Sequence, residues 1–385
     1  MRSPDHISPS SKVQAIGAVD PESIGKMLTN HAITNDPEED IVVRQAIEKI
    51  EDYLMENAPV YRELQDIRAK GWENLEGDRF FENRQRQADE SSGKVIHQVR
   101  ILMEDISKEI QCFTRAFTIR STEANPQILD MCMAPGVYLA KALERNPNAH
   151  AVAFTLPPSQ GGHIPTLSES ETLKIHLLDI TMLAADMGIK SNEIPQEHPD
   201  AANFLPRHFD DGQSFDLVLY DGILLRSQDR AAYRFYREFS RLLLTQLALG
   251  LEHLRPGGTM IILLHKVERI INIRLLRDFA RFATVKLFKP KSGHAKRSSF
   301  YMIASEIRSR DKEAIEAVQG WKREWKIATL GTDGEWREDY TRVASFGDLG
   351  IDGVLEEFGP TLIKLGQKVW RTQADALKVA SFNKK

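Results

Sequence analysis

Short apolar runs alternate with amphipathic stretches through the middle of the chain. Seven runs have the length and composition of strands, and they follow one another as QILDM, HAVAFTL, LKIHLLDI, FDLVLYDG, GGTMIILLH, TVKLFKP and SFYMIASEI. Helical spacing of apolar residues separates the first two runs (137–145), the fourth and fifth (231–254), and the fifth and sixth (270–282). Strands that alternate with helices predict a parallel sheet with helices on both faces.

The last two runs are joined only by KSGHAKRS, without a helical stretch between them. They therefore predict an antiparallel pair at one edge of the sheet, because parallel strands need a longer crossover. The segment between the third and fourth runs is long and rich in loop residues, as an insertion would be. These features together predict an α/β fold with a Rossmann-like sheet of seven strands.

Helical periodicity also fills the chain on both sides of the predicted sheet. Apolar positions recur at helical spacing over 40–120, and again after about residue 311, with breaks at GTDG and FGDLG. The first residues are polar and rich in Pro and Ser, without an apolar signal core. We therefore predict four regions, which are a flexible N-terminus (1–36), a helical N-terminal region (37–120), the sheet domain (121–307) and a helical C-terminal region (308–385).

Composition narrows the class of protein. The 385 residues are 42% hydrophobic, which is enough for a core, and no apolar run approaches the roughly 20 residues that a membrane span needs. Two cysteines, Cys112 and Cys132, are not a disulfide framework, so we expect an intracellular protein, cytoplasmic or nuclear. The histidines lack Cys or acidic partners at ligand spacing, and no metal site is predicted.

The stretch ILDMCMAPG, residues 128–136, ends the first strand and turns tightly into a helix. In doubly wound sheets ligands bind beyond the carboxyl ends of the strands, and Gly136 leaves room for one at this turn. Free N–H groups at the start of the next helix would point at it. An ordinary strand–helix turn is the alternative interpretation. A single Pro-Gly is not the three-glycine dinucleotide fingerprint, which argues against a nicotinamide cofactor.

Acids stand at the ends of three predicted strands. Asp130 ends the first, Asp179 follows the third and Asp221 follows the fourth, so all three are expected at one edge of the sheet. Seven strands that end in an antiparallel pair resemble the sheet of S-adenosylmethionine-dependent methyltransferases, and this resemblance implies that Asp179 accepts a hydrogen bond from an adenine amino group and that Asp221 lies in the crevice beside the methyl donor. Each acid has a helix cap or a turn as its alternative role. The second strand ends in Thr155 instead of an acid that would bind ribose.

Five motifs of this sheet resemble the FtsJ-like (RrmJ-type) RNA ribose 2′-O-methyltransferase family. LDMCMAPGVYLAKAL is similar to the family's LDLGAAPGGFSQYL, and LLDIT, FDLVLYDG, LRPGGTMII and LFKPKSGHAKRSSFYMIA match its later motifs in order. The resemblance covers about Gln127 to Glu306. It implies S-adenosylmethionine as the methyl donor and RNA as the substrate. The cofactor residues that it implies are Asp130, Cys132, Ala134, Pro135, Gly136, Thr155, Asp179, Ile180 and Asp221.

The resemblance also implies a Lys-Asp-Lys-Glu set in which a lysine of lowered pKa helps to deprotonate the ribose hydroxyl. The Asp corresponds to Asp221, and Lys108 is the nearest candidate for the first Lys. The second Lys falls on Leu263, so Lys266, three residues later, is the candidate, with His265 as an alternative base. The Glu falls on Ser299. A solvated residue at a strand end is the alternative interpretation of Lys266.

Basic residues gather in two places, although the formal net charge is −4. Residues 266–297 contain ten basic residues and two acids. The arginines from 226 to 241 repeat every three or four residues, which predicts one helical face. Both are expected to contact phosphates, with a solvated surface as the alternative. The predicted RNA-binding residues are Arg226, Arg230, Arg234, Lys289, Lys291, Lys296 and Arg297.

Two functions stay open at this point. The first is an S-adenosylmethionine-dependent methyltransferase acting on RNA ribose, with Asp221, Lys266 and Lys108 as catalytic residues. The second is a decayed methyltransferase fold that serves as an RNA- or protein-binding module, with the helical ends as partner surfaces. The missing Glu and the missing acid of the second strand favour the second. The Pro-Gly turn and the strand-end acids favour the first. A small-molecule methyltransferase is a weaker third possibility.

Overall fold

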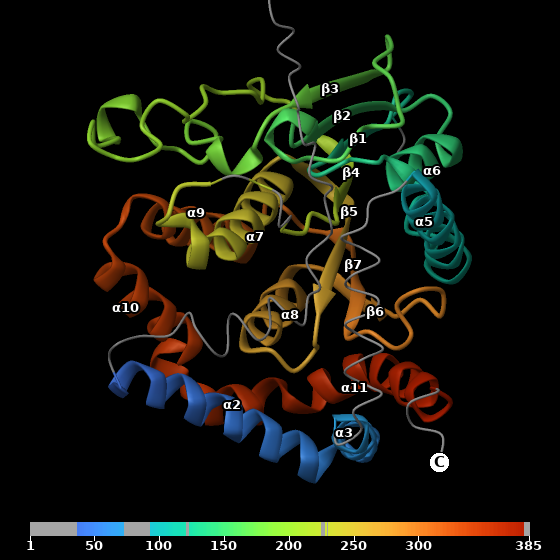
Figure 1. The fold of residues 1–385 in the computed structure, drawn as a ribbon, viewed down its shortest axis with the longest axis vertical. Coiled ribbons are helices and arrows are strands. Elements are labelled where there is room, and N and C mark those ends of the chain that lie inside the picture. The colour runs from blue at the N-terminus through green and yellow to red at the C-terminus, as the bar shows by residue number, and fades with distance from the viewer. Residues whose placement is uncertain (1–36, 73–92, 121–122, 225–227, 229, 381–385) are drawn as a thin grey trace, which may run out of the picture.

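The computed structural model describes residues 37–72, 93–120, 123–224, 228 and 230–380. The expected flexible N-terminus (1–36) and Arg226 lie outside the described residues. Within them, one seven-stranded sheet has the order β3-β2-β1-β4-β5-β7-β6 (Figure 1). Its strands are β1 (Gln127–Asp130), β2 (His150–Thr155), β3 (Leu173–Leu177), β4 (Phe215–Tyr220), β5 (Leu254–His265), β6 (Thr284–Phe288) and β7 (Ser299–Ile307).

The first five strands run parallel, and β7 is antiparallel to both of its neighbours, β5 and β6. The predicted seven-stranded α/β fold and its antiparallel pair are therefore confirmed, with β6 as the edge strand. All six residues of β4 are buried. Leu217 and Leu219 face one apolar cluster while Val218 and Tyr220 face another, because side chains of a strand alternate between two covered faces.

Helices cover both faces of the sheet (Figure 1). On one face α5 packs against α6, and on the other α7 packs against α9 beside α8. The helices of these two layers are α5 (Gly93–Thr114), α6 (Val137–Arg145), α7 (Arg234–Glu252), α8 (Ile270–Phe282) and α9 (Lys312–Leu330). The long connection from β3 to β4 contains two single turns of 3-10 helix, at 180–182 and 191–193.

The helical ends of the chain meet each other below the sheet in the view of Figure 1. Here α2 (Pro37–Asn57) and α3 (Pro59–Trp72) pack against α11 (Gly350–Lys378), and α10 (Asp333–Ala344) packs against α2. The break between α2 and α3 falls at Pro59, because proline has no N–H for a helix interior and suits a first helical position. Regions predicted as separate helical ends thus join into one helical layer.

Arg68 of α3 ties this helical layer to the carboxyl edge of the sheet. Its guanidinium donates to the Glu268 carboxylate at 3.0 Å, the Gln373 side chain of α11 at 3.0 Å and the Ser298 hydroxyl at 3.3 Å. Arg68 and Glu268 are 10% and 8% exposed. The segments just after β5 and just before β7 are therefore held by residues from both ends of the chain.

Candidate active site

The carboxyl ends of the parallel strands bring Asp130 and Asp221 to one edge of the sheet, as predicted. Asp130 ends β1 and Asp221 follows β4, its parallel neighbour. The Asp130 carboxylate accepts from the Cys132 N–H at 3.2 Å. The Oδ1 atom of Asp221 is buried and has no hydrogen-bond partner among the described residues. A buried polar atom without a partner is uncommon and calls for an explanation.

The two carboxyl groups influence each other electrostatically. Burial raises the pKa of Asp130 well above its ordinary value, and repulsion from Asp221 raises it further. Burial raises the pKa of Asp221 to about 7. Two carboxyl groups that share a water-poor site cannot both ionise easily. A positively charged ligand group beside them would stabilise both ionised forms, so this part of the edge is suited to a cation.

The turn between β1 and α6 requires a glycine, because the protein's own side chains pack against it. Gly136 adopts a φ of 105°, and a Cβ added there would lie 2.9 Å from the Met133 sulfur. The carbonyl of Pro135 accepts from the Thr166 N–H at 2.9 Å and from its hydroxyl at 2.6 Å, which fixes the turn. Ala134 and Pro135 are half-buried at this turn. The helix α6 starts directly afterwards, so its first N–H groups face the carboxyl edge.

The β1 and β4 loops approach each other closely at the same edge. A Cβ added to Gly222 would lie 2.4 Å from the Cys132 sulfur, so glycine is needed for this approach. The Gly222 N–H donates to the Gln246 side chain at 3.3 Å. Burial, followed by the nearby Asp221 charge, raises the pKa of Cys132 well above its ordinary value. Cys132 is therefore a neutral thiol that lines the edge, and no nucleophilic role follows for it.

Asp179 lies at the same edge but is fully engaged with the protein. One oxygen accepts from the Thr181 N–H at 2.9 Å and the Thr181 hydroxyl at 2.7 Å, and it caps the 3-10 turn that begins at Ile180. The other accepts from Arg234 at 2.6 Å and Gln228 at 3.0 Å. Sequence reasoning named a cap as the alternative role of this acid. Thr155 and Ile180, the other two residues expected here, are 5% and 3% exposed.

The end of β5 holds the two residues considered as bases. Lys266 has a φ of 59°, a left-handed conformation that costs a non-glycine residue roughly 1–3 kcal/mol. The Asn272 side chain holds it there by donating to the Lys266 carbonyl at 2.6 Å. His265 is half-buried, its Nδ1 has no partner among the described residues, and burial lowers its pKa well below the ordinary value. His265 is therefore a neutral imidazole at neutral pH.

Strand register explains the two mismatched positions of the implied catalytic set. Leu263 pairs with Tyr301, and His265 pairs with Ser299, across the antiparallel ladder between β5 and β7. The Tyr301 and Tyr138 hydroxyls are 2.6 Å apart on the face that α6 covers. Leucine and serine thus occupy the positions of the expected Lys and Glu, and Lys266 lies beyond the last paired residue of β5.

Lys289, predicted to bind RNA, is instead a buried lysine of this edge. It is 6% exposed, and its ammonium group donates to the carbonyl oxygens of Arg297 and, at 2.8 Å, Ser299. Burial lowers its pKa to about 7. The alternation in TVKLFK would have revealed this, because Lys289 shares its strand face with Val285 and Leu287, which pack on the core. The prediction that Lys289 contacts RNA at the surface is therefore wrong.

Lys108, the candidate for the first catalytic lysine, lies elsewhere. It lies on α5 and donates to Asp105 on the same helix at 3.1 Å. It lines a cavity between α5 and α6 whose other lining residues include neither Asp221 nor Lys266. The structure therefore does not bring Lys108 together with the strand-end acids in one cavity.

The arginine row is not an exposed polyanion-binding face. Arg234, Arg237 and Arg241 of α7 are 4%, 3% and 0% exposed. Arg234 and Arg241 pair with the buried Glu238 at 2.5 and 2.8 Å. An RNA role for Arg234 is therefore wrong, because buried guanidinium groups that are paired inside the protein cannot reach a phosphate. Arg230, just before the helix, is half-buried.

The loop between β6 and β7 keeps part of the predicted basic surface. Lys291 and Arg297 are exposed and Lys296 is half-buried. The backbone of this loop is held by Glu109 of α5, whose carboxylate accepts from the Lys291 and Ser292 N–H groups at 2.8 Å each. Because β7 is antiparallel, this loop lies at the same edge as Asp221.

Two further expectations concern metal binding and membrane-spanning helices. Among the described residues, no cluster of three or more His, Cys, Asp or Glu side chains is placed to hold a metal ion. Over the same residues, the helices are all too short or too polar to span a bilayer.

Comparison with known families gives a match to the sheet domain. The family model of FtsJ-like methyltransferases matches residues 104–307, more than half of the chain. The resemblance seen over about 127–306 is thereby confirmed, and the match extends back into α5. Among curated proteins, none matches the chain.

Several solved structures are also similar. Human methyltransferase-like protein 13 in complex with SAH is 15% identical, with 58% of this chain and 92% of that chain covered and a TM-score of 0.31. The N-methyltransferase NodS from Bradyrhizobium japonicum is 11% identical, with coverages of 53% and 96% and a TM-score of 0.32. An rRNA methylase from Streptococcus thermophilus is 11% identical, with coverages of 55% and 96% and a TM-score of 0.27. Values this low identify no substrate.

Proposed function

The chain belongs to the FtsJ-like methyltransferase family, and we propose that it transfers a methyl group from S-adenosylmethionine to a ribose 2′-hydroxyl of RNA. One observation carries the proposal. Asp221 is half-buried, and its buried Oδ1 atom has no hydrogen-bond partner among the described residues, next to the fully buried Asp130 at the edge of the sheet where such folds bind ligands. A protein that keeps an uncompensated acid there leaves a place for a cationic ligand.

The residues of this edge fit the family's cofactor, S-adenosylmethionine, by their chemistry. When bound, it supplies an electrophilic methyl group on a positively charged sulfur, and it carries a second cation in its amino group. Asp130 and Asp221 would offset these charges. Cys132, Ala134, Pro135 and Gly136 would line the methionine and ribose portion, with Thr155 at the end of β2. Asp179 and Ile180 would border the adenine, for which Asp179 would exchange its bond from Gln228.

The chain's own residues would carry the proton transfer. We assign Lys266 as the group that takes the proton from the ribose hydroxyl, and Asp221 as the group that orients donor and acceptor. The strained conformation of Lys266 supports this role, because the strained backbone is held by the Asn272 side chain at a functional edge. Lys289 is the rival base, since its pKa is about 7 and a base acts best when its pKa is near the operating pH.

An RNA substrate is supported by the family and by the basic loop between β6 and β7. Lys291, Lys296 and Arg297 extend from that loop at the edge that carries Asp221. Contacts to phosphate would position a strand there without reading its sequence. An intracellular site of action, cytoplasmic or nuclear, is part of this proposal. The two described cysteines, Cys112 and Cys132, are unpaired, in keeping with a reducing compartment.

A second function is favoured by the register of β5 and β7. Leucine and serine stand where the family pattern places Lys and Glu, as Leu263 and Ser299. A chain that has lost these groups would bind RNA or a protein partner without methyl transfer. The two functions differ in whether the cofactor binds and reacts.

Calorimetric titration with S-adenosylmethionine and S-adenosylhomocysteine is the first test, and both should bind. Tritium transfer from labelled S-adenosylmethionine to total RNA follows. A product methylated at the 2′-oxygen resists alkaline cleavage at the modified nucleotide, because that oxygen is no longer free to attack the phosphate. Binding without transfer would support the second function, and a folded sample that binds neither ligand contradicts both the donor and the reaction.

The base is tested by two matched variants, Lys266→Ala and Lys289→Ala. We expect Lys266→Ala to lower the transfer rate by about 10²-fold or more, since general base catalysis typically contributes 10²–10⁴-fold. Added alkylamines should restore part of that rate. If Lys289→Ala instead lowers the rate and removes a kinetic pKa near 7, the assignment moves to Lys289.

A further inference from the structure

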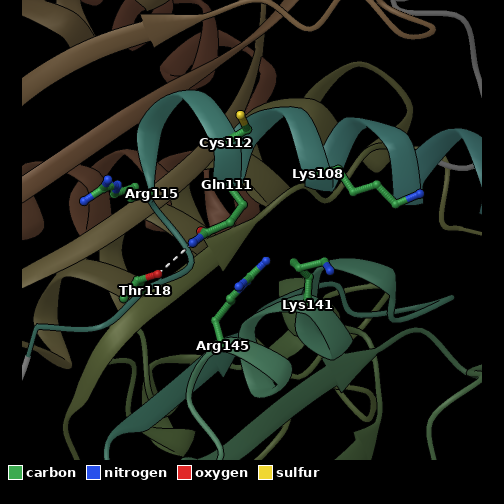
Figure 2. A pocket seen from close by; sticks show the side chains of 7 residues that line it. All are labelled: Lys108, Gln111, Cys112, Arg115, Thr118, Lys141 and Arg145. Carbon is green, nitrogen blue, oxygen red and sulfur yellow. Dashed lines mark hydrogen bonds between the residues drawn. The ribbon is translucent and has the colours of Figure 1, made fainter.

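A cavity of about 510 Å³ lies between α5 and α6, away from the site described above. Its size is in the range of ligand-binding clefts. Figure 2 shows Lys141 and Arg145 extending from α6 toward α5, and Gln111 reaching from α5 to Thr118. Four of the seven lining residues are cations and none is an acid, the full set being Lys108, Gln111, Cys112, Arg115, Thr118, Lys141 and Arg145.

The end of α5 is shaped by two fixed contacts at this cavity. The Gln111 side chain accepts from the Phe117 N–H at 3.2 Å and donates to the Thr118 hydroxyl at 2.7 Å. Arg115 follows the helix with a φ of 56°, in the left-handed region where glycine usually ends a helix. A side chain kept at this position in spite of the strain is consistent with a use for the guanidinium group.

Acids near the cavity only partly offset its charge. Lys108 pairs with Asp105 at 3.1 Å, and Glu144 pairs with Lys141 at 2.5 Å and with Arg145 at 3.8 Å. The Lys108, Arg145 and Glu144 side chains are 63%, 47% and 56% exposed, whereas Lys141 is 15% exposed. Exposed ion pairs are worth little, so a ligand anion can compete with Asp105 for Lys108 and with Glu144 for Arg145.

The cavity is connected to the strand-end acids by one helix, α6. The helix α6 starts at the cofactor turn, and Lys141 and Arg145 lie four and eight residues after its first residue, Val137. At 1.5 Å per residue they are about 6 and 12 Å along the helix axis from that turn. This separation of the two cations is comparable with that of neighbouring phosphates in a single strand.

We propose that this cavity binds successive phosphates of a single-stranded RNA whose ribose is presented at the carboxyl edge of the sheet. The inference rests on the proposed function, because it names where the RNA substrate is held. Guanidinium and ammonium groups on one side of an open cleft suit phosphate oxygens, and the Gln111 amide and Thr118 hydroxyl suit the sugar edge. The buried arginine row of α7 cannot serve this purpose, so the cavity replaces it as the main phosphate site.

The first test compares two double variants with the same change in charge. Lys141→Gln/Arg145→Gln removes two cations from the cavity, while Lys312→Gln/Lys364→Gln removes two exposed lysines from α9 and α11. Binding of a fluorescein-labelled 20-nucleotide RNA is followed by anisotropy at several salt concentrations. The cavity variant should bind about tenfold more weakly, and its slope of log affinity against log salt should fall by about 1.4, or about 0.7 per lost phosphate contact.

The second test measures the accessibility of Cys112, which lines the cavity and is exposed. The alkylation rate of Cys112 by iodoacetamide is measured by mass spectrometry of its peptide. RNA should slow this reaction several-fold, and inorganic phosphate at the same total phosphate concentration should not. Protection by inorganic phosphate alone would assign the cavity to a free anion and overturn the RNA assignment.

The outcomes separate this inference from the proposed function. If the cavity variant binds and methylates RNA as the wild type does, the cavity is not the phosphate site, although methyl transfer to RNA stands. If RNA binding depends on the cavity but no methyl is transferred, the cavity assignment holds and the methyltransferase function fails. S-adenosylhomocysteine should bind the cavity variant with unchanged affinity. Loss of that binding would show a general disturbance of the fold and contradict a local role.

Discussion

Asp179 and Asp221 each follow a strand at the same edge of the sheet, and their surroundings are opposite. Asp179 accepts hydrogen bonds from Thr181, Gln228 and Arg234. Burial alone would raise its pKa, but the Arg234 charge and these hydrogen bonds outweigh burial and lower it. Asp221 has an oxygen without a partner, and burial raises its pKa to about 7.

From this difference we infer a structural role for Asp179 and propose a ligand-binding role for Asp221. A buried carboxylate with its own counter-ion is satisfied by the fold, and its removal leaves Arg234 uncompensated. A buried carboxylate without one destabilises the fold, and its presence needs a reason outside the fold. Asp179 in LLDI and Asp221 in LYDG have similar sequence contexts. We expect Asp179 to stabilise the fold and Asp221 to destabilise it while binding a ligand.

The largest expected effect is on methyl transfer in Asp221→Asn. The amide keeps the shape but cannot offset a cationic donor, so transfer should fall about 10³-fold, which corresponds to about 4 kcal/mol. The melting temperature should stay or rise, because an unfavourable buried charge is removed. Asp211→Asn, at an acid that is 93% exposed in its pair with Arg207, is the control and should change neither quantity. Full activity in Asp221→Asn would remove this acid from the site.

Asp179→Asn should have the opposite signature. Removing one member of a buried ion pair leaves Arg234, 5% exposed, without its full compensation. We expect the free energy of unfolding to fall by about 3 kcal/mol, measured by urea denaturation, with Asp211→Asn again as the control. If stability is unchanged while adenine-containing ligands bind more weakly, the structural role of Asp179 is contradicted and only its role at the adenine remains.

Cofactor binding should depend on pH through Asp221. Its pKa of about 7 in the folded, ligand-free protein means that protonation competes with a cationic ligand below pH 7. The association constant for S-adenosylmethionine should fall nearly tenfold per pH unit there, or about 100-fold at pH 5. The same raised pKa contributes stability that is present below about pH 4 and lost as pH rises through 7. Asp221→Asn should flatten both profiles, and a pH-independent affinity of the wild type contradicts this account.

The smallest expected effect concerns a single hydroxyl beside Asp179. Thr181→Val removes the 2.7 Å bond to that carboxylate at a residue that is 2% exposed. Stability should fall by about 1 kcal/mol. Thr372→Val, at an exposed threonine that bonds the Lys368 carbonyl, should change it by less than about 0.5 kcal/mol. Equal losses in the two variants would show that Asp179 is not specially supported.

Local patterns in the sequence predicted the fold closely. The helices 137–145 and 270–282 have their predicted bounds, and α7 starts three residues later than predicted, at Arg234. The breaks at GTDG and FGDLG fall between α9, α10 and α11. These features are local, because apolar periodicity and the backbone preferences of Gly and Pro act over a few residues. Asp130, Gly136 and Asp221 followed from the same reasoning, since strand ends of a parallel sheet share an edge.

Side-chain partners were not predictable in this way. The arginines of α7 were predicted to form a charged surface, because several of their partners are far away in sequence. Arg241, for example, donates to the Thr329 hydroxyl and to the Thr181 carbonyl. Lys289 was predicted to be a surface cation, but its ammonium group is buried and donates to the Ser299 carbonyl at the start of β7. Lys108 was predicted to be catalytic, but it lines the cavity between α5 and α6 together with Arg145.

The sequence by itself determined the seven strands, the helices between them, the tight turn at Gly136 and the family, because these depend on patterns within short stretches of the chain. Only the tertiary structure decided which charged groups are buried in ion pairs and which lie at the surface or at the edge of the sheet. That distinction depends on the distance between groups remote in sequence and on the water excluded around them. It therefore separates Asp179 from Asp221, and the α7 arginines from the cations between α5 and α6.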